Sequence, residues 1–364
     1  MPYSFVLTGG GSGGHVFPAV AVARVLRERG HRLLFIGTRQ GMESRLIPEA
    51  GFDLEFIRIG ALNRVGRRKQ LQTASQLPLS IASAWRLLRR FRPRAVFSTG
   101  GYVAGPVMLA AVLAGIPIVV MEANATPGFA NRKIARRVYR ALVAFESASA
   151  WFPAGRSEVT GLPVRGEFFE MQPRRGEKFT LFLTGGSRGA RALNRASRES
   201  WPLFRSDRSP VRILHQAGMR EHEALAKEFA GSGLDGEVVP FIRNMAETFQ
   251  TADLVVSRSG AGTVSEIAAS ASASILVPLP FAADDHQRRN AEQLVEAGAA
   301  RMVLDSEMTG ERLFHEVEDL RKNPATLAAM RERVRSFARP GAAERAATVL
   351  EDAALKKNSR RSAE

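Results

Sequence analysis

The chain has 364 residues, of which 45% are hydrophobic and 24% are charged, and it contains no cysteine. This composition excludes a disordered or fibrous protein, and the missing cysteines exclude disulfides, thiolate metal sites and cysteine nucleophiles. The formal net charge of +16 favours an anionic partner, which leaves nucleic acid, phospholipid head groups and sugar diphosphates as candidates.

The length favours two domains of ordinary size with a cleft between them. Met1 to Phe5 lead directly into an apolar run and glycines, without the basic and apolar regions of a secretion signal. The most apolar stretch, Val103 to Met121, is interrupted by glycine and proline, so we expect no membrane-spanning helix. These features predict a cytoplasmic protein.

The first apolar run leads into a glycine-rich loop at residues 9–14. Its spacing matches the dinucleotide-binding pattern, in which missing side chains let the backbone approach a phosphate. The pattern alone is weak, because the next apolar run ends in Thr38-Arg39 and offers no acidic residue to hold a ribose. A hydride-transfer enzyme with a phosphorylated cofactor, which Arg39 would serve, remains an alternative.

His15 follows this loop at the start of a predicted helix, with Pro18 in the expected first turn. The positive end of a helix dipole disfavours an imidazolium ion, so we expect a neutral His15 that can accept a proton. The alternative is that His15 only caps the turn.

A segment without acidic residues lies between Glu55 and Glu122. It contains ten basic residues, namely Arg58, Arg64, Arg67, Arg68, Lys69, Arg86, Arg89, Arg90, Arg92 and Arg94. Apolar residues are interleaved with them, namely Leu77, Leu79, Ile81, Trp85, Leu87, Leu88 and Phe91. This basic amphipathic pattern favours an anionic membrane surface, and the alternative is a solvated helix face beside a buried stripe. Nucleic acid is disfavoured, because no binding module is recognisable.

The apolar run and glycines at residues 5–10 return at residues 181–186, and a helical pattern follows each. Other apolar runs alternate with helical patterns, at residues 32–36, 95–98, 116–121, 212–215, 252–257 and 273–277. The alternation predicts an α/β fold of two Rossmann-like, doubly wound domains with parallel sheets. Ligands of such sheets bind beyond the carboxyl ends of the strands, where the glycine loops lie.

A segment rich in proline and glycine at residues 152–173 indicates the junction between the domains. We therefore expect one domain at residues 1–160 and a second at residues 161–341. A helical pattern at residues 342–355 could pack on either domain, and residues 356–364 are predicted to form a flexible tail.

The second domain carries two further loops, at residues 185–190 and 257–266, which place backbone donors at helix starts. Two such loops in one domain suit a diphosphate with a nucleoside attached. Thr263 and Glu266 also have the spacing of a capping box, so the alternative is that Glu266 only satisfies a helix end.

Five ordered motifs then identify a family. They are GGSGGHVFP at 10–18, TGGYVAGP at 99–106, GGSRGA at 185–190, SGAGTVSE at 259–266 and DDHQRRNA at 284–291. Together they resemble the MurG family of UDP-N-acetylglucosamine-dependent N-acetylglucosamine transferases, across nearly the whole chain. Family members have the GT-B architecture, in which two Rossmann-like domains face each other across a cleft. The resemblance places the donor nucleotide in the second domain, the lipid acceptor on the first, and the last helix on the first domain.

The resemblance also implies roles for single residues. Donor-binding residues would be Ser12, Gly13, Asn124, Arg165, Ser187, Ile242, Ser259, Thr263, Glu266 and Gln287. Acceptor-binding residues would be Gly13, Gly14, Gly100, Gly101 and Tyr102. His15 is the candidate general base. The chain departs from the family pattern at Ser12, Arg188, Met121 to Ala123 and Leu162, where threonine, glutamine, His-Glu-Gln and asparagine are usual.

The implied reaction is an inverting transfer of N-acetylglucosamine to the C4 hydroxyl of a lipid-linked muramyl-peptide, without a covalent intermediate. No aspartate-rich metal clamp is recognisable, so we expect neither a bound metal nor a tightly bound cofactor. The implied partners are UDP-N-acetylglucosamine, undecaprenyl-linked muramyl-peptide, an anionic membrane surface and cell-wall synthesis proteins. The implied location is peripheral, on the cytoplasmic face of the inner membrane. Two alternatives remain, another GT-B transferase such as a diacylglycerol glycosyltransferase, and a catalytically silent nucleotide-sugar or membrane-surface binding protein.

Overall fold

The computed structural model describes residues 2–60, 67–170, 176, 178–208 and 210–361, and the chain forms two compact units. The first unit comprises Met1–Pro163 and Gly341–Glu364, and the second comprises Val164–Pro340. The junction expected between residues 160 and 161 therefore lies instead between Pro163 and Val164.

The first unit is built on a parallel sheet of seven strands in the order β3-β2-β1-β4-β5-β6-β7. The strands are β1 (Ser4–Gly9), β2 (Arg32–Gly37), β3 (Leu54–Phe56), β4 (Ala95–Gly100), β5 (Ile118–Glu122), β6 (Arg140–Val143) and β7 (Ser157–Val159). The central strands are apolar and buried, as expected for a sheet covered on both faces. The strand order reverses at β1 and β4, so their carboxyl ends form the position where such folds bind ligands.

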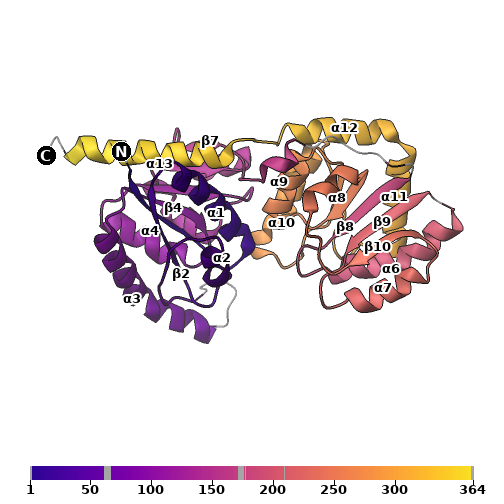
Figure 1. Ribbon diagram of the computed structural model, residues 1–364, viewed down its shortest axis with the longest axis horizontal. Helices are drawn as coiled ribbons and strands as arrows, with labels where there is room; N and C mark the ends of the chain where they lie inside the picture. The colour runs from indigo at the N-terminus through magenta and orange to yellow at the C-terminus, as the bar shows by residue number, and fades with distance from the viewer. Residues whose placement is uncertain (1, 61–66, 171–175, 177, 209, 362–364) are drawn as a thin grey trace. The chain divides into compact units, whose positions relative to one another are not determined.

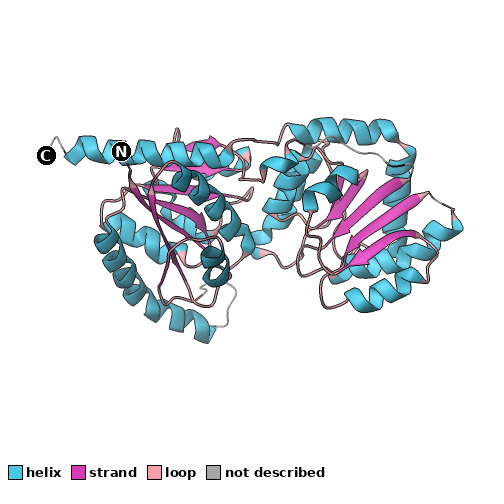
Figure 2. Ribbon diagram, in the orientation of Figure 1, coloured by secondary structure: helices cyan, strands magenta, loops and turns pink. Residues whose placement is uncertain are grey.

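Helices cover both faces of this sheet (Figures 1 and 2). They are α1 (Gly13–Glu28), α2 (Glu43–Glu49), α3 (Arg67–Phe91), α4 (Ala104–Leu113), α5 (Phe129–Ile134) and α13 (Ala342–Arg361), with short 3₁₀ turns at Ala135–Arg137 and Glu146–Trp151. Helices α3 and α4 pack against each other, and their apolar sides join Val6, Val96 and Ile118 in one core cluster. Side chains alternate between the faces of a strand, so Phe5 and Leu7 point to the opposite face, which α1 and α13 cover.

Helix α3 shows that most of the apolar residues predicted to face a membrane instead face the protein interior. Of the seven apolar side chains expected on a membrane-facing stripe, Leu88 lies in the core cluster of the first unit. Five more are partly buried and pack against that cluster, namely Leu77, Ile81, Trp85, Leu87 and Phe91. Only Leu79 of that set is strongly exposed, at 74%. The side chains of the basic residues 64 and 67–69 lie outside the described residues, whereas Arg86, Arg89 and Arg90 are exposed.

Helix α13 belongs to the first unit and runs to Arg361, so the tail predicted from residue 356 is helical for most of its length. The Arg345 guanidinium donates to both Glu158 carboxylate oxygens, at 2.6 and 2.9 Å, which joins α13 to edge strand β7. Glu351 accepts from Arg29 at 2.7 Å and pairs with His31 at 2.8 Å. The hydrogen bonds from Arg345 lower the pKa of Glu158.

The second unit is a parallel sheet of six strands in the order β10-β9-β8-β11-β12-β13. The strands are β8 (Phe179–Thr184), β9 (Val211–Gln216), β10 (Asp235–Val239), β11 (Leu254–Ser257), β12 (Ser274–Leu276) and β13 (Arg301–Met302). The helices are α6 (Arg191–Ser206), α7 (His222–Ala230), α8 (Met245–Thr251), α9 (Ala261–Ala269), α10 (His286–Glu296), α11 (Gly310–Lys322) and α12 (Pro324–Arg335), with 3₁₀ turns at Gly166–Phe168 and Ala283–Asp285. The sequence prediction of two doubly wound α/β units is confirmed. Of the helices in the described part of the chain, none is long and apolar enough to span a bilayer.

Candidate functional site

Three loops of the first unit follow neighbouring strands at the carboxyl edge of the sheet. Residues 10–15 follow β1, residues 101 and 102 follow β4, and Asn124 follows β5. Since β1, β4 and β5 are adjacent, the fold brings the predicted residues of this unit to one edge. These are Ser12, Gly13, Gly14, His15, Gly100, Gly101, Tyr102 and Asn124.

His15 is joined to the loop after β4 by two reciprocal hydrogen bonds. Its Nδ1 lies 2.8 Å from the carbonyl oxygen of Thr99, and the Thr99 hydroxyl donates to the His15 carbonyl at 2.7 Å. A carbonyl oxygen only accepts, so Nδ1 carries the proton. In the neutral ring the lone pair therefore resides on Nε2, which is the atom that can receive a proton from a substrate.

Helix α1 begins with donors that have no internal acceptor. Ser12 is the N-cap, its side chain makes no capping hydrogen bond, and its carbonyl accepts from the amides of His15 and Val16. The amides of Gly13 and Gly14 donate to no acceptor among the described residues, which is the arrangement that binds anions at helix starts. Pro18 was expected in the first turn, but it is the sixth residue of the helix, because α1 starts at Gly13.

The two glycine loops of the first unit approach each other closely. Gly100 and Gly101 have φ angles of +93° and +86°, which favour glycine. A Cβ atom on Gly101 would lie 2.3 Å from the Gly10 carbonyl oxygen. Any other residue at position 101 would push the two loops apart.

Glu122, at the end of β5, organises the third loop. Its buried carboxylate accepts from the Asn124 amide at 3.0 Å, from the Asn124 side chain at 3.2 Å and from the Gly128 amide at 3.0 Å. The second oxygen also accepts from the Asn131 side chain at 2.9 Å. Glu122 therefore keeps its contact with Asn124, although Met121 and Ala123 depart from the family pattern.

In the second unit, the loop after β8 carries Ser187 and Arg188, both exposed. Gly186 and Gly189 adopt φ angles of +79° and +72°, and a Cβ on Gly189 would lie 1.9 Å from the Ala217 carbonyl oxygen. Because only glycine fits this tight turn, the backbone can hold Ser187 at the surface, at the carboxyl edge of the sheet.

Helix α9 follows β11 and contains both Thr263 and Glu266. Its N-cap is Gly260 and not Thr263, and no side chain caps it, so the capping-box alternative is wrong. Glu266 lies within the helix and is half-buried. Burial raises the pKa of Glu266 to about 7, against the opposing influence of the Arg165 guanidinium. This carboxyl therefore titrates near neutral pH.

Arg165 is an exposed residue at the start of the 3₁₀ turn Gly166–Phe168. Its guanidinium lies 3.1 Å from the Glu167 carboxylate and 5.0 Å from the centre of the Phe168 ring. These contacts leave the cation at the surface of the second unit.

Ser259 and Gln287 connect two loops of the second unit. The Ser259 hydroxyl is fully buried and donates to the Gln287 carbonyl at 2.8 Å, so it has an internal partner. The Gln287 side chain accepts from the Leu279 amide at 3.0 Å. The preceding residues Asp284 and Asp285 adopt left-handed φ angles of +50° and +53°, a strain that typically occurs at ligand sites.

Gln216 is a supporting residue that the sequence did not reveal. Its side-chain oxygen accepts from the Ile242 amide at 2.8 Å, and its side-chain nitrogen donates to the Thr184 hydroxyl at 3.2 Å. The same hydroxyl accepts from the Gly186 amide at 3.1 Å. Gln216 thus fixes the predicted donor residue Ile242 relative to the loop after β8.

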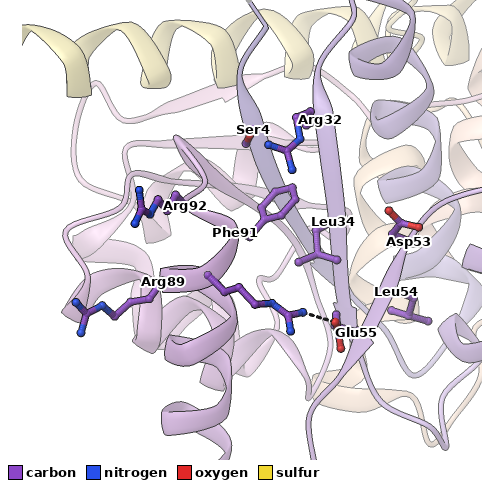
Figure 3. A pocket seen from close by; sticks show the side chains of 10 residues that line it. Ser4, Arg32, Leu34, Asp53, Leu54, Glu55, Arg89, Phe91 and Arg92 are labelled. Carbon is purple, nitrogen blue, oxygen red and sulfur yellow. Dashed lines mark hydrogen bonds and ion pairs between the residues drawn. The ribbon is translucent and has the colours of Figure 1, made fainter.

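A cavity of about 930 Å³ lies elsewhere, at the amino ends of β1, β2 and β3 (Figure 3). Its walls include four arginines and two acidic residues, and the full lining is Ser4, Arg32, Leu34, Asp53, Leu54, Glu55, Arg89, Arg90, Phe91 and Arg92. Arg90 pairs with Glu55, and the Arg32 guanidinium lies 5.5 Å from the centre of the Phe91 ring. None of the predicted site residues lines this cavity, and it lies at the sheet edge opposite the glycine loops.

No group of three or more histidine, aspartate or glutamate side chains among the described residues is placed to hold a metal ion. The absence of a bound metal and of a tightly bound cofactor stays a prediction.

Comparison with known proteins agrees with this geometry. Residues 5–143 match the Glycosyltransferase family 28 N-terminal domain, and residues 180–346 match the Glycosyltransferase family 28 C-terminal domain. The crystal structure of Acinetobacter baumannii MurG superposes with a TM-score of 0.81 at 34% identity, covering 96% of this chain and 100% of that one. The fold and its loops thus define a glycosyltransferase of the GT-B architecture.

Two curated relatives carry the same long name, UDP-N-acetylglucosamine–N-acetylmuramyl-(pentapeptide) pyrophosphoryl-undecaprenol N-acetylglucosamine transferase. The protein from Solibacter usitatus is 55% identical over 352 residues, covering 96% of each chain. The protein from Halorhodospira halophila is 44% identical over 359 residues, covering 96% of this chain and 98% of that one. The chain therefore belongs to the MurG family of glycosyltransferases.

Proposed function

We propose that this enzyme transfers N-acetylglucosamine from UDP-N-acetylglucosamine to the C4 hydroxyl of undecaprenyl-pyrophosphoryl-muramyl-peptide, with inversion at the anomeric carbon. The name of a relative that is 55% identical contains both substrates and supports them here. The observation that carries the proposal is the arrangement at the start of α1. His15, whose Nδ1 is held by the Thr99 carbonyl, directly follows Gly13 and Gly14, whose amides open the helix and would be available to a diphosphate.

The donor would bind the second unit. Glu266 would accept hydrogen bonds from the ribose hydroxyls, and the Ile242 carbonyl would accept one from the uracil. The loop after β8, with Ser187 and Arg188, would hold the diphosphate together with Arg165. Gln287 would contact the sugar hydroxyls. Charge that develops on the leaving diphosphate would be stabilised by main-chain amides and by the exposed guanidinium groups of Arg165 and Arg188.

The acceptor would bind the first unit, with its diphosphate on the amides of Gly13 and Gly14 and against the loop at Gly100 to Tyr102. His15 would then take the proton of the attacking hydroxyl on Nε2, while Thr99 holds the ring through Nδ1. Proton transfer of this kind contributes about a hundredfold to ten-thousandfold in rate.

We also propose peripheral binding to the anionic cytoplasmic face of the inner membrane, where the lipid acceptor would be embedded. Leu79 of α3 and Leu113 at the end of α4 are 74% and 72% exposed, and the two helices pack against each other. The exposed Arg86 and Arg89 lie on the same helix as Leu79. Apolar residues beside arginines suit a surface with lipid tails and anionic head groups.

The test is incubation of the purified chain with labelled UDP-N-acetylglucosamine and a lipid-linked muramyl-peptide analogue, followed by detection of the disaccharide product. We expect label in the lipid-linked product and release of UDP. In a parallel incubation with diacylglycerol as the acceptor, transfer to diacylglycerol alone would indicate a different GT-B transferase. Donor binding without release of UDP would indicate a catalytically silent binding protein.

A further inference from the structure

Glu43 is a fully buried acidic residue at the start of α2, close to the glycine loop that precedes α1. One carboxylate oxygen accepts from the Gly11 amide at 2.9 Å. The other accepts from the Thr38 amide at 3.0 Å and from the Thr38 hydroxyl at 2.7 Å. Three hydrogen bonds therefore offset the cost of burying this charge.

The backbone around Glu43 leaves space for its side chain. A Cβ atom on Gly10, Gly37 or Gly41 would lie 2.6, 2.7 or 1.9 Å from atoms of the Glu43 side chain. Gly10 follows β1, Gly37 ends β2 and Gly41 lies between β2 and α2, so glycines from two connections enclose one carboxyl group. Two of them also belong to the glycine pattern and the second-strand end from which the sequence suggested a phosphate or ribose site.

The network continues to the second glycine loop. The Thr38 hydroxyl lies 2.9 Å from the Tyr102 hydroxyl. Since Thr38 has one hydroxyl proton and donates it to Glu43, Tyr102 must be the donor to Thr38. The Tyr102 oxygen therefore offers only lone pairs to a substrate.

The contacts of Glu43 separate the paired main-chain donors of the first glycine loop from the unpaired ones. The Glu43 carboxyl group accepts from the Gly11 amide, so this donor is already paired within the protein. The amides of Gly13 and Gly14 have no acceptor among the described residues and lie two and three residues further along the chain.

We propose that Glu43 is a positioning residue for the acceptor half of the site. It holds the first glycine loop so that Gly13 and Gly14 receive the diphosphate, and through Thr38 it orients Tyr102 as a hydrogen-bond acceptor. The inference rests on the proposed function. It adds a polar relay, Glu43 to Thr38 to Tyr102, that joins both glycine loops of the first unit.

The test compares Glu43→Gln with Glu49→Gln, the same substitution at an exposed position of the same helix. A carboxamide cannot accept from both Gly11 and Thr38, so one buried donor loses its partner. We expect the KM for the lipid acceptor to rise about tenfold to a hundredfold, which is the usual consequence of losing a hydrogen bond to a charged group. The KM for UDP-N-acetylglucosamine should change less than about threefold, and Glu49→Gln should match the wild type.

A second pair of variants covers the case in which Glu43→Gln does not fold. Thr38→Ser keeps the hydroxyl and should retain the acceptor KM, whereas the isosteric Thr38→Val should raise it about tenfold. Equal changes in both KM values, or equal behaviour of Thr38→Ser and Thr38→Val, would overturn the positioning role.

Hydrogen exchange gives a readout that does not depend on turnover. In Glu43→Gln, amides in the segment 9–14 should exchange at least about tenfold faster than in Glu49→Gln, with segments of the second unit unchanged. Unchanged exchange in this segment would also overturn the inference. If the wild type transfers no sugar, the proposed function fails, and the exchange comparison still tests Glu43.

Discussion

Donor affinity is expected to depend on pH through Glu266. Burial raises the pKa of this carboxyl to about 7 from an ordinary 4.5. At pH 6 about one tenth of the free enzyme therefore carries the carboxylate, and at pH 8 about nine tenths does. If ribose hydroxyls donate to the ionised form, the Kd for UDP-N-acetylglucosamine should fall about tenfold between pH 6 and pH 8.

Isothermal titration calorimetry measures this Kd at pH 6, 7 and 8. The nucleotide sugar is the appropriate ligand, because the terminal phosphate of UDP titrates near pH 6 and would add its own pH dependence. Binding at pH 7 should release about half a proton per donor, which calorimetry in two buffers of different ionisation enthalpy detects.

Glu266→Gln is the control variant. Its affinity should not change with pH, and at pH 8 it should bind about tenfold to a hundredfold more weakly than the wild type. A wild-type Kd that stays constant from pH 6 to pH 8, or a Glu266→Gln variant that keeps the tenfold change, would refute this account. The same pKa shift affects folding. Because the pKa of Glu266 is raised in the folded state, the free energy of unfolding should decrease as pH rises from 4.5 to about 7.

Three further predictions concern other parts of the chain. His15→Ala should lower kcat at saturating substrates by at least about a hundredfold, and turnover within a few fold of wild type would remove His15 as the base. The fraction of protein that floats with liposomes should increase with anionic lipid, decrease with salt and be smaller for Leu79→Glu. A fraction that does not change with lipid charge or salt would contradict membrane binding. Arg345→Ala should reduce the free energy of unfolding by about 1 kcal/mol or less at neutral pH, and by more than Arg335→Ala on α12 does. Since the pKa of Glu158 is lowered in the folded state, the difference between the two variants should vanish as pH falls below 4.5. Equal melting curves for both variants at neutral pH would argue against a stabilising Arg345–Glu158 pair.

The central strands could be predicted because they are apolar runs, and β1, β2, β4, β5, β8, β9, β11 and β12 are all found where the sequence placed them. The interior strand β6 was missed, and so were the edge strands of both sheets, namely β3, β7, β10 and β13. Each is short or carries polar residues such as Glu55, Glu158, Asp235 and Arg301, because one side of an edge strand meets solvent. The apolar runs therefore identified all the interior strands of the second sheet and all but β6 of the first, and none of the edge strands.

The candidate site followed from glycine patterns, but its supporting residues did not. Glu43 and Gln216 act through buried hydrogen bonds to backbone amides of loops distant in sequence, and no local spacing marks such contacts. For helix α3, in contrast, the sequence pattern predicted a membrane-facing surface that the structure largely does not have. Its alternating basic and apolar residues have the same pattern whether the apolar face meets lipid or a protein core, and burial of Leu88 decides for the core.

The place of α13 determines the order in which the nascent chain can fold. Residues 164–340 are continuous, so the second unit can complete as soon as it leaves the ribosome. The first unit cannot, because Ala346, Leu350 and Ala353 of α13 are buried in it. The N-terminal half, which in most multidomain proteins folds first, is therefore finished last here. A chain truncated after Pro340 should keep a protease-resistant second unit and lose resistance in the first, and a resistant first unit would show that α13 is dispensable.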